Sequence, residues 1–180
     1  PRAETPTDYI SMGADPDLCR REISKFSAKD ADAYPQYNAF LERVAAVLEP
    51  VLSQAAPDPL PLPEEWRNIG LGKRIRDGKK LWALYRALGE LGADLPPAVE
   101  LLTGAARPIL DRWFESDVLK APMSVSGIIG TFLGVRSPGT AYVLLHHYMG
   151  EIDGAFRAWG IPKGGTGGVS YSIARAAQAL

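Results

Sequence analysis

Apolar residues between positions 34 and 51 recur at alternating spacings of three and four, which is the period of one face of an α-helix. They are Tyr34, Tyr37, Leu41, Val44, Leu48 and Val51. Ser27 and Asp30 precede this stripe with the spacing of a capping box. The pattern predicts a core-packing helix over residues 28–54, kinked near Pro35 and weakened near Pro50, because proline cannot donate a backbone hydrogen bond.

Similar periodicity predicts a succession of shorter helices along the rest of the chain. We expect them over residues 79–91, 96–103, 105–115 and 117–129, from Ser137 through Tyr148, and from Val169 to Leu180. Strand-like alternation is confined to Tyr9–Met12. The sequence therefore predicts a mainly α fold with little strand.

The expected organisation is a single helical region over residues 1–180. It divides into a strand and turn lead-in over 1–26, a helical body over 27–158, and a glycine-rich loop with its helix over 159–180. The chain begins without a methionine and ends inside a predicted helix, so we expect a fragment of a longer protein.

Charge and cysteine content argue against several kinds of partner. Twenty Lys and Arg against 21 Asp and Glu give a net charge of −1, which disfavours nucleic acid. One cysteine, Cys19, and two adjacent histidines disfavour a metal site. Because a single cysteine cannot form an internal disulfide, we also expect a reducing, cytoplasmic location. The longest uncharged run, Ala121–Val135, is shorter than the roughly 20 residues that span a bilayer, although it can touch a membrane surface.

Four glycines between positions 164 and 168 precede the last predicted helix. Glycine can adopt positive φ and lets a ligand approach backbone N–H donors, and the helix dipole adds partial positive charge there. A plain flexible turn explains the same glycines. No Gly-x-Gly-x-x-Gly fingerprint of a dinucleotide fold occurs in the chain, so it lacks a recognisable nucleotide-binding half of its own.

Three further features admit both a functional and a structural interpretation. His146 and His147 can act as acid–base catalysts or simply pack in a helix interface. The apolar stretch containing Met123, Ile128, Ile129 and Phe132 can line a substrate site or belong to the core. The cations of residues 73–80 can form a solvated helix end or a docking patch for an acidic membrane or partner surface.

Several motifs together resemble one protein family. They are Arg21–Ser27 with Asp30-Ala31, Trp113–Ser116, Gly127–Phe132, Ser137–Tyr142, His146-His147 and the Trp159–Gly168 loop. In this combination the chain resembles the phytoene-desaturase-like FAD-dependent oxidoreductases, within them the branch of pyridine nucleotide-disulphide oxidoreductase domain-containing proteins. The resemblance covers nearly the whole chain.

The resemblance implies a helical substrate-side (cap) subdomain of a two-domain flavoprotein. FAD would be held by a flavin domain elsewhere in the same parent chain, and the enzyme would be a dehydrogenase or desaturase acting on an apolar, lipid- or carotenoid-like substrate. The fragment alone would be inactive. Lys163, Gly164, Gly165, Gly167 and Gly168 would then lie at the mouth of the flavin or substrate pocket.

A second interpretation makes the chain a non-enzymatic helical interaction module. It would dock on a membrane surface or a partner protein through the basic residues 73–80. A dinucleotide-binding unit in the same polypeptide would favour the enzyme, and its absence would favour the module.

Overall fold

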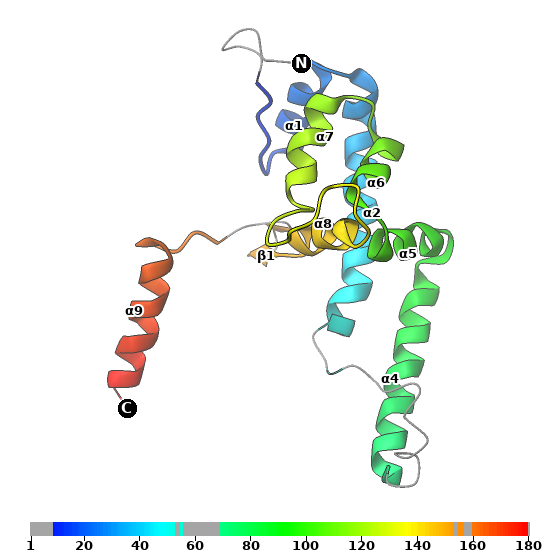
Figure 1. The fold of residues 1–180 in the computed structure, drawn as a ribbon, viewed down its shortest axis with the longest axis vertical. Helices are drawn as coiled ribbons and strands as arrows, with labels where there is room; N and C mark the ends of the chain where they lie inside the picture. Colours follow the sequence, from blue (N-terminus) through cyan, green and yellow to red (C-terminus); the bar gives the residue numbers. More distant parts are fainter. Residues whose placement is uncertain (1–8, 53–54, 56–68, 153–154, 157–159, 180) are drawn as a thin grey trace. The chain divides into compact units, whose positions relative to one another are not determined.

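A computed structural model describes residues 9–52, 55, 69–152, 155–156 and 160–179 of the chain (Figure 1). Internal contacts divide the chain into two units, Pro1–Met149 and Gly150–Leu180. The described part of the first unit is helical: α1 Pro16–Ser24, α2 Ala28–Leu52, α4 Leu71–Glu90, the short 3-10 helix η1 Gly92–Asp94, α5 Leu95–Thr103, α6 Ala106–Trp113, α7 Asp117–Val125 and α8 Thr140–Tyr148. The prediction of a mainly α fold is confirmed.

Helix α2 is the centre of the first unit. It occupies Ala28–Leu52, with Pro35 and Pro50 inside it; its start agrees with the predicted residue 28, and residues 53–54 of the predicted helix lie outside the described residues. Five of the six stripe residues are buried, and Val51 near its end is half-buried. Helices α1, α4, α6 and α8 all contact α2. The apolar stripe therefore forms the core that its period predicted.

Aromatic rings join α2 to α6. The ring of Tyr37 lies edge-on to those of Trp113 and Phe114, with centroid separations of 5.7 and 5.1 Å. Phe40 stacks on Trp113 at 5.9 Å. Such pairs add to the stability that burial alone provides. They fix the end of α6, which leads directly into α7.

The lead-in differs from its prediction, because Tyr9–Met12 forms no strand and a helix follows it. The side chain of Asp15 accepts a hydrogen bond from the N–H of Asp17 at 2.9 Å, and Pro16 occupies the first turn, so both favour a helix start. The N–H of Ser11 donates to the carboxylate of Glu22 at 3.0 Å. The backbone N–H of Ser11 is thus satisfied by a side chain and not by the backbone of a partner strand.

Three helix ends also differ from prediction. Helix α4 begins at Leu71, before the predicted residue 79, so the basic residues lie within it. Helix α7 ends at Val125, and residues 126–130 form turns in place of the predicted last turn of helix. Helix α8 begins at Thr140, after Ser137-Pro138, because Gly139 adopts a left-handed conformation with φ of 87°.

The described residues of the second unit form a two-residue ladder and one helix. Strands β1 Glu151–Ile152 and β2 Ala155–Phe156 pair antiparallel. Helix α9 spans Gly165–Gln178 and begins before the predicted Val169. Trp159, part of the predicted loop, lies outside the described residues.

Candidate functional site

The segment between α7 and α8, residues 126–139, is tied to the core near both ends. A Cβ added to Gly127 would lie 2.9 Å from the carbonyl oxygen of Thr140 and 3.0 Å from the Cβ of Ala106, so only glycine fits this approach without movement. Further along, the N–H of Arg107 donates to the carbonyl of Val135 at 2.8 Å. The fully buried Thr140 completes the anchor, since its hydroxyl accepts from the N–H of Ala106 at 3.0 Å.

Between these anchors the chain exposes apolar side chains. Ile129 and Leu133 are more than two-fifths exposed, Phe132 is fully exposed, and Val125 at the nearby end of α7 is exposed as well. We call Val125, Ile129, Phe132 and Leu133 the apolar loop patch. Burying such residues is favourable, so an exposed cluster on an anchored loop is a candidate contact surface.

The predicted substrate-lining residues therefore separate into two groups. Met123 is buried in the core on α7, and Ile128 is half-buried. Ile129 and Phe132 face outward and belong to the apolar loop patch. The α7 end of the stretch therefore packs internally, and the loop end is exposed; a substrate-lining role for these residues stays a prediction.

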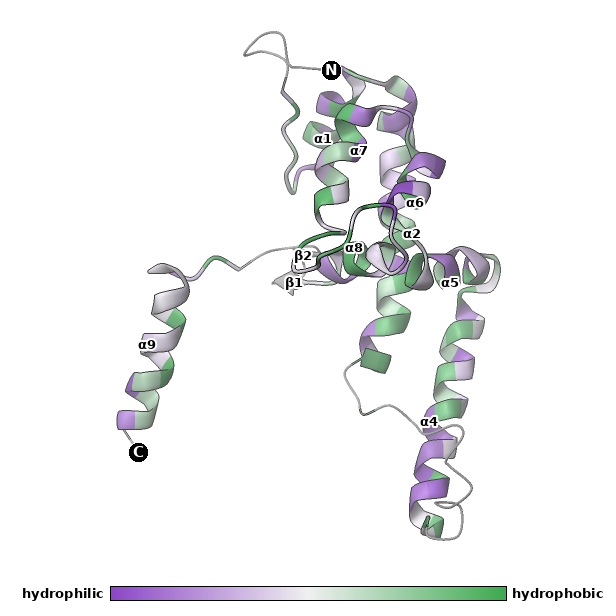
Figure 2. Cartoon of the chain, in the orientation of Figure 1, coloured by the Kyte–Doolittle hydropathy of each residue, from purple (hydrophilic) through white to green (hydrophobic). Residues whose placement is uncertain are grey.

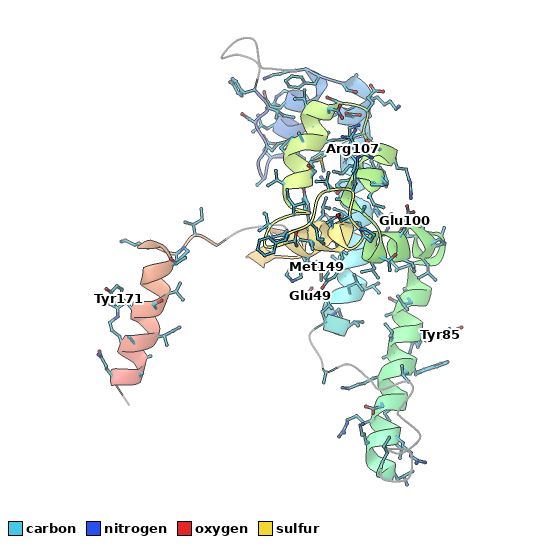
Figure 3. All side chains as sticks on the ribbon, viewed as in Figure 1. Glu49, Tyr85, Glu100, Arg107, Met149 and Tyr171 are labelled. Atoms are coloured by element: carbon cyan, nitrogen blue, oxygen red, sulfur yellow. The ribbon has the colours of Figure 1, made fainter. Side chains whose placement is uncertain are left out.

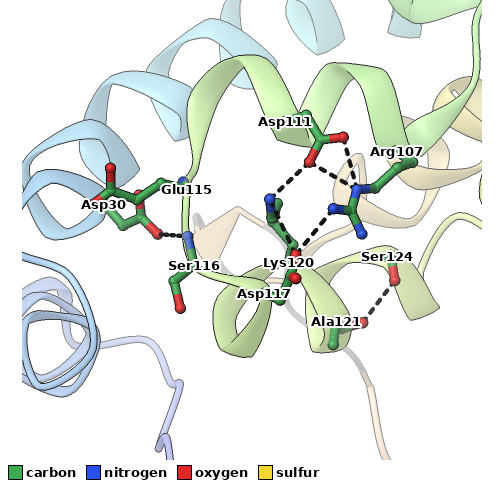
Figure 4. Close-up of polar contacts among 9 residues, drawn as sticks. All are labelled: Asp30, Arg107, Asp111, Glu115, Ser116, Asp117, Lys120, Ala121 and Ser124. Atoms are coloured by element: carbon green, nitrogen blue, oxygen red, sulfur yellow. Dashed lines mark hydrogen bonds and ion pairs between the residues drawn. The ribbon is translucent and has the colours of Figure 1, made fainter. Parts of the chain in front are cut away.

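An ion-pair cluster fixes α6 against α7 (Figure 4). The guanidinium of Arg107 contacts the carboxylates of Asp111 at 2.8 Å and Asp117 at 3.0 Å. The nearly buried ammonium of Lys120 contacts the same two carboxylates at 2.8 and 3.2 Å. The hydrogen bonds from Arg107 and then Lys120 lower the pKa of Asp111, and the hydrogen bond to Asp111 raises the pKa of Lys120.

The ion-pair geometry favours a structural role for the cluster, and the pKa directions agree with it. A lowered carboxyl pKa and a raised amine pKa both lie further from neutral pH, whereas general acid–base catalysis requires a pKa near neutral pH. Lys120 and Asp111 therefore keep fixed charges at neutral pH. Their role is to hold α7, and so the base of the apolar loop patch, against α6.

A second polar contact holds the start of α7 to α2. The completely buried carboxylate of Asp30 accepts from the N–H groups of Glu115 at 2.8 Å and Ser116 at 2.9 Å (Figure 4). The hydroxyl of Ser27 accepts from the N–H of Asp30 at 3.1 Å and donates to the carboxylate of Glu115 at 2.8 Å. The hydrogen bond from Ser27, with Lys29 nearby, lowers the pKa of Glu115.

Only half of the predicted capping box at α2 is therefore present. Ser27 accepts from Asp30 as expected, but the carboxylate of Asp30 is used at the start of α7 instead of returning to Ser27. Local spacing did not predict this long-range contact. The signal that could have suggested it is an acidic residue beside an otherwise apolar stripe, since a buried carboxylate requires partners.

The two histidines occupy the last turn of α8. His147 is half-buried, and its Nδ1 lies 2.8 Å from the carbonyl oxygen of Val143, to which Nδ1 donates in the tautomer that carries the proton on Nδ1. His146 is exposed, with its ring 6.0 Å from that of Tyr142. This is the arrangement of the packing interpretation, and the catalytic role stays a prediction. No cluster of His, Cys, Asp or Glu in the described ranges could hold a metal ion.

Most glycines of the terminal loop have a structural task. Gly164 and Gly165 have φ of 89° and 69°, and the N–H of Gly165 donates to the carbonyl of Pro162 at 2.9 Å. A Cβ on Gly168 would lie 2.6 Å from the carbonyl oxygen of Lys163. Gly167 meets no such restriction. The turn thus accounts for three of the four glycines, and a ligand-binding role for the loop, including exposed Lys163, stays a prediction.

Two grooves among the described residues of the first unit contain no residue that the sequence predicts to bind cofactor or substrate. One, of about 220 Å³, lies between α2 and α4. The other, of about 110 Å³, lies beside Trp113 and Ile109. Pockets for cofactor-sized ligands are larger, about 300–1,000 Å³. No helix among the described residues has the length and apolarity needed to cross a bilayer.

Comparison with known proteins found close sequence relatives. The chain is 38% identical over 174 residues to the rat protein named pyridine nucleotide-disulfide oxidoreductase domain-containing protein 2, covering 97% of this chain and 29% of the relative. The mouse protein of the same name is 38% identical over 168 residues, covering 93% of this chain and 28% of its own length. No family model and no solved structure matches.

The matched region is almost the entire chain, yet the chain spans less than a third of the length of these relatives. An identity of 38% over this length reflects common ancestry. The similarity supports a place for this chain in the oxidoreductase family after which its rat and mouse relatives are named.

Proposed function

We propose that the chain is the substrate-side region of a larger FAD-dependent oxidoreductase of the phytoene-desaturase-like type. The parent enzyme would remove hydride from an apolar, lipid- or carotenoid-like substrate, and the flavin domain of the same polypeptide would hold FAD. The similarity to oxidoreductase-domain proteins supports the enzyme class. The alternative of a non-enzymatic module has no support from these relatives.

The observation that carries the proposal for the substrate is the apolar loop patch. Its exposed apolar side chains can contact an apolar molecule and form one wall of its binding site. The contacts of Gly127 and Arg107 hold this loop in place. A wall of this kind orients a substrate and excludes water, both of which favour hydride transfer. By this proposal Ile129 and Phe132 contact substrate, and Met123 supports them from the core.

The turn geometry explains Gly164, Gly165 and Gly168. By this proposal the main FAD contacts come from another part of the parent. Lys163 and Gly167 remain the residues of the loop that we propose for the edge of that site. The single buried cysteine, Cys19, agrees with the reducing, cytoplasmic location that we propose.

The test uses the full-length protein that contains this chain. The purified protein should show flavin absorbance, and the Phe132→Ala variant should keep its flavin but bind a fluorescent fatty acid about tenfold more weakly, because one large apolar contact is lost. Val99→Ala, an exposed apolar residue on α5, is the matched control and should leave binding unchanged. Absence of flavin from the wild-type protein would reject the enzyme, and equal affinity in both variants would reject the apolar wall.

A further inference from the structure

Helix α4 carries an apolar stripe that the core does not use. Leu71, Ile75, Trp82 and Tyr85 recur with Gly78 at spacings of four and three and so share one face of the helix. All four are exposed, and no residue of α4 is buried. Figure 2 shows hydrophobic and hydrophilic residues alternating along this helix.

A different face of α4 packs against α2. Leu81, Leu84 and Leu88 are half-buried, and Leu84 lines the groove that α4 forms with Val47 of α2. At about 100° per residue this leucine face lies roughly 120° around the helix from the exposed stripe. The exposed stripe is therefore a second apolar face and not an extension of the core.

Two aromatic side chains form the centre of the stripe. Trp82 is 62% exposed and Tyr85 is 70% exposed, and their rings stack with centroids 5.6 Å apart at an angle of 25°. Figure 3 shows Tyr85 projecting from the helix. Trp and Tyr have amphipathic rings that favour the membrane–water boundary, where the ring is buried and its polar atom stays wet.

Cations flank this stripe. Helix α4 contains six Lys or Arg residues against Asp77 and Glu90, in a chain whose net charge is −1. On the helical projection Arg74 lies beside one edge of the stripe, and Lys79 and Arg86 lie beside the other. Long cationic side chains in these positions can reach anionic headgroups while the apolar stripe enters the bilayer boundary.

We propose that α4 docks flat on an anionic membrane surface, with Leu71, Ile75, Trp82 and Tyr85 inserted at the headgroup boundary and Arg74, Lys79 and Arg86 on the lipid phosphates. The long straight stripe and the cations on both of its edges match an interfacial helix. The exposed rings of Trp82 and Tyr85 between cations favour a lipid boundary over an acidic protein surface, because such rings partition to the membrane–water interface. The inference does not depend on flavin or on hydride transfer.

The experiment measures co-sedimentation of the full-length protein with vesicles of phosphatidylcholine alone and with vesicles that also contain about 30% anionic phosphatidylglycerol. We expect binding to the anionic vesicles only, weakened by added salt. The Trp82→Ala/Tyr85→Ala variant should bind at least tenfold more weakly, because it loses the inserted rings. Arg86→Gln should lower binding about fivefold, as expected for one lipid-facing cation.

Matched controls test whether the effect belongs to this face. Tyr171→Ala removes an exposed aromatic from α9, and Arg136→Gln removes an exposed cation from the segment before α8; neither should change binding. Circular dichroism should show unchanged helix content in all variants, because the substituted residues are exposed.

Three outcomes would overturn the proposal. The first is failure of the wild-type protein to bind anionic vesicles, as expected if another part of the polypeptide covers α4. The second is equal loss of binding in the α4 variants and their controls. The third is a wild-type dimer, seen by light scattering, that Trp82→Ala/Tyr85→Ala dissociates, because the stripe would then be an interface between copies of the chain.

Discussion

Helices α2 and α4 are the two longest in the described part of the chain, at 25 and 20 residues, and they differ in how far they are buried. Nine residues of α2 are buried, whereas none of α4 is. Helix α2 contacts helices on several sides, and α4 has one packed face, on α2, and one exposed aromatic stripe. The sequence shows helical apolar periodicity in both.

The difference shows that an apolar stripe predicts a helix face but not its partner. In α2 the stripe is buried, the rings of Tyr37 and Phe40 contact the end of α6, and the Asp30 carboxylate binds the start of α7. The exposed stripe of α4 is not buried in the fold, so the free energy of burying it can still drive contact with another surface. Substitutions of equal chemistry in the two regions should therefore have unequal consequences for stability.

The largest contrast should come from two aspartates. Asp30→Ala removes the acceptor of two backbone N–H groups and should lower the free energy of unfolding by about 3 kcal/mol, because charge-assisted hydrogen bonds are lost in a buried place. Asp77→Ala on α4 should change it by less than about 0.5 kcal/mol. Urea unfolding of the chain, followed by circular dichroism, measures both. Similar losses in the two variants would mean that α4 is as firmly packed as α2.

Glycines provide the next contrast. Gly127→Ala should destabilise the chain by about 2 kcal/mol, because the new Cβ meets Thr140 and Ala106. Gly78→Ala in α4 meets nothing within 4 Å and should stabilise the helix by about 0.5–1 kcal/mol through higher helix propensity. Melting temperatures should move in opposite directions. A stable Gly127→Ala variant would show that the loop between α7 and α8 can shift away from its anchor.

The smallest expected effect concerns acid stability. The pKa of Asp111 is lowered in the folded chain, so its contribution to stability is complete above pH about 4 and is lost as the pH falls through the lowered value. Asp111→Asn should cost less than about 1 kcal/mol at pH 7, because the pair is partly exposed, and this difference from wild type should shrink below pH 4. Asp77→Asn is the control. Urea midpoints of wild type and variant at pH 7, 5 and 3 measure this difference. A stability difference that grows on acidification would contradict a lowered pKa of Asp111.

The candidate site was only partly predictable from sequence. The stretch that forms the apolar loop patch was recognised as apolar, but the burial of Met123 and the exposure of Phe132 depend on where α7 ends. The long-range contacts of Asp30 could not be read from local spacing, because their partners lie 85 and 86 residues away. The positive φ expected of the terminal glycines is present at Gly164 and Gly165, and a turn accounts for it and for Gly168, whereas their cofactor-binding role stays a prediction.

By itself the sequence determined the helical class, the extent of α2 and the stripe that α2 buries, because each follows from local spacing and proline and glycine chemistry. Only the tertiary structure decided that Asp30 caps α7, that Gly127 is a contact point, and that one face of α4 has no partner among the described residues. These outcomes depend on which surfaces meet after the helices form. A periodic pattern specifies the direction of a side chain from its helix axis, and the rest of the fold specifies what lies in that direction.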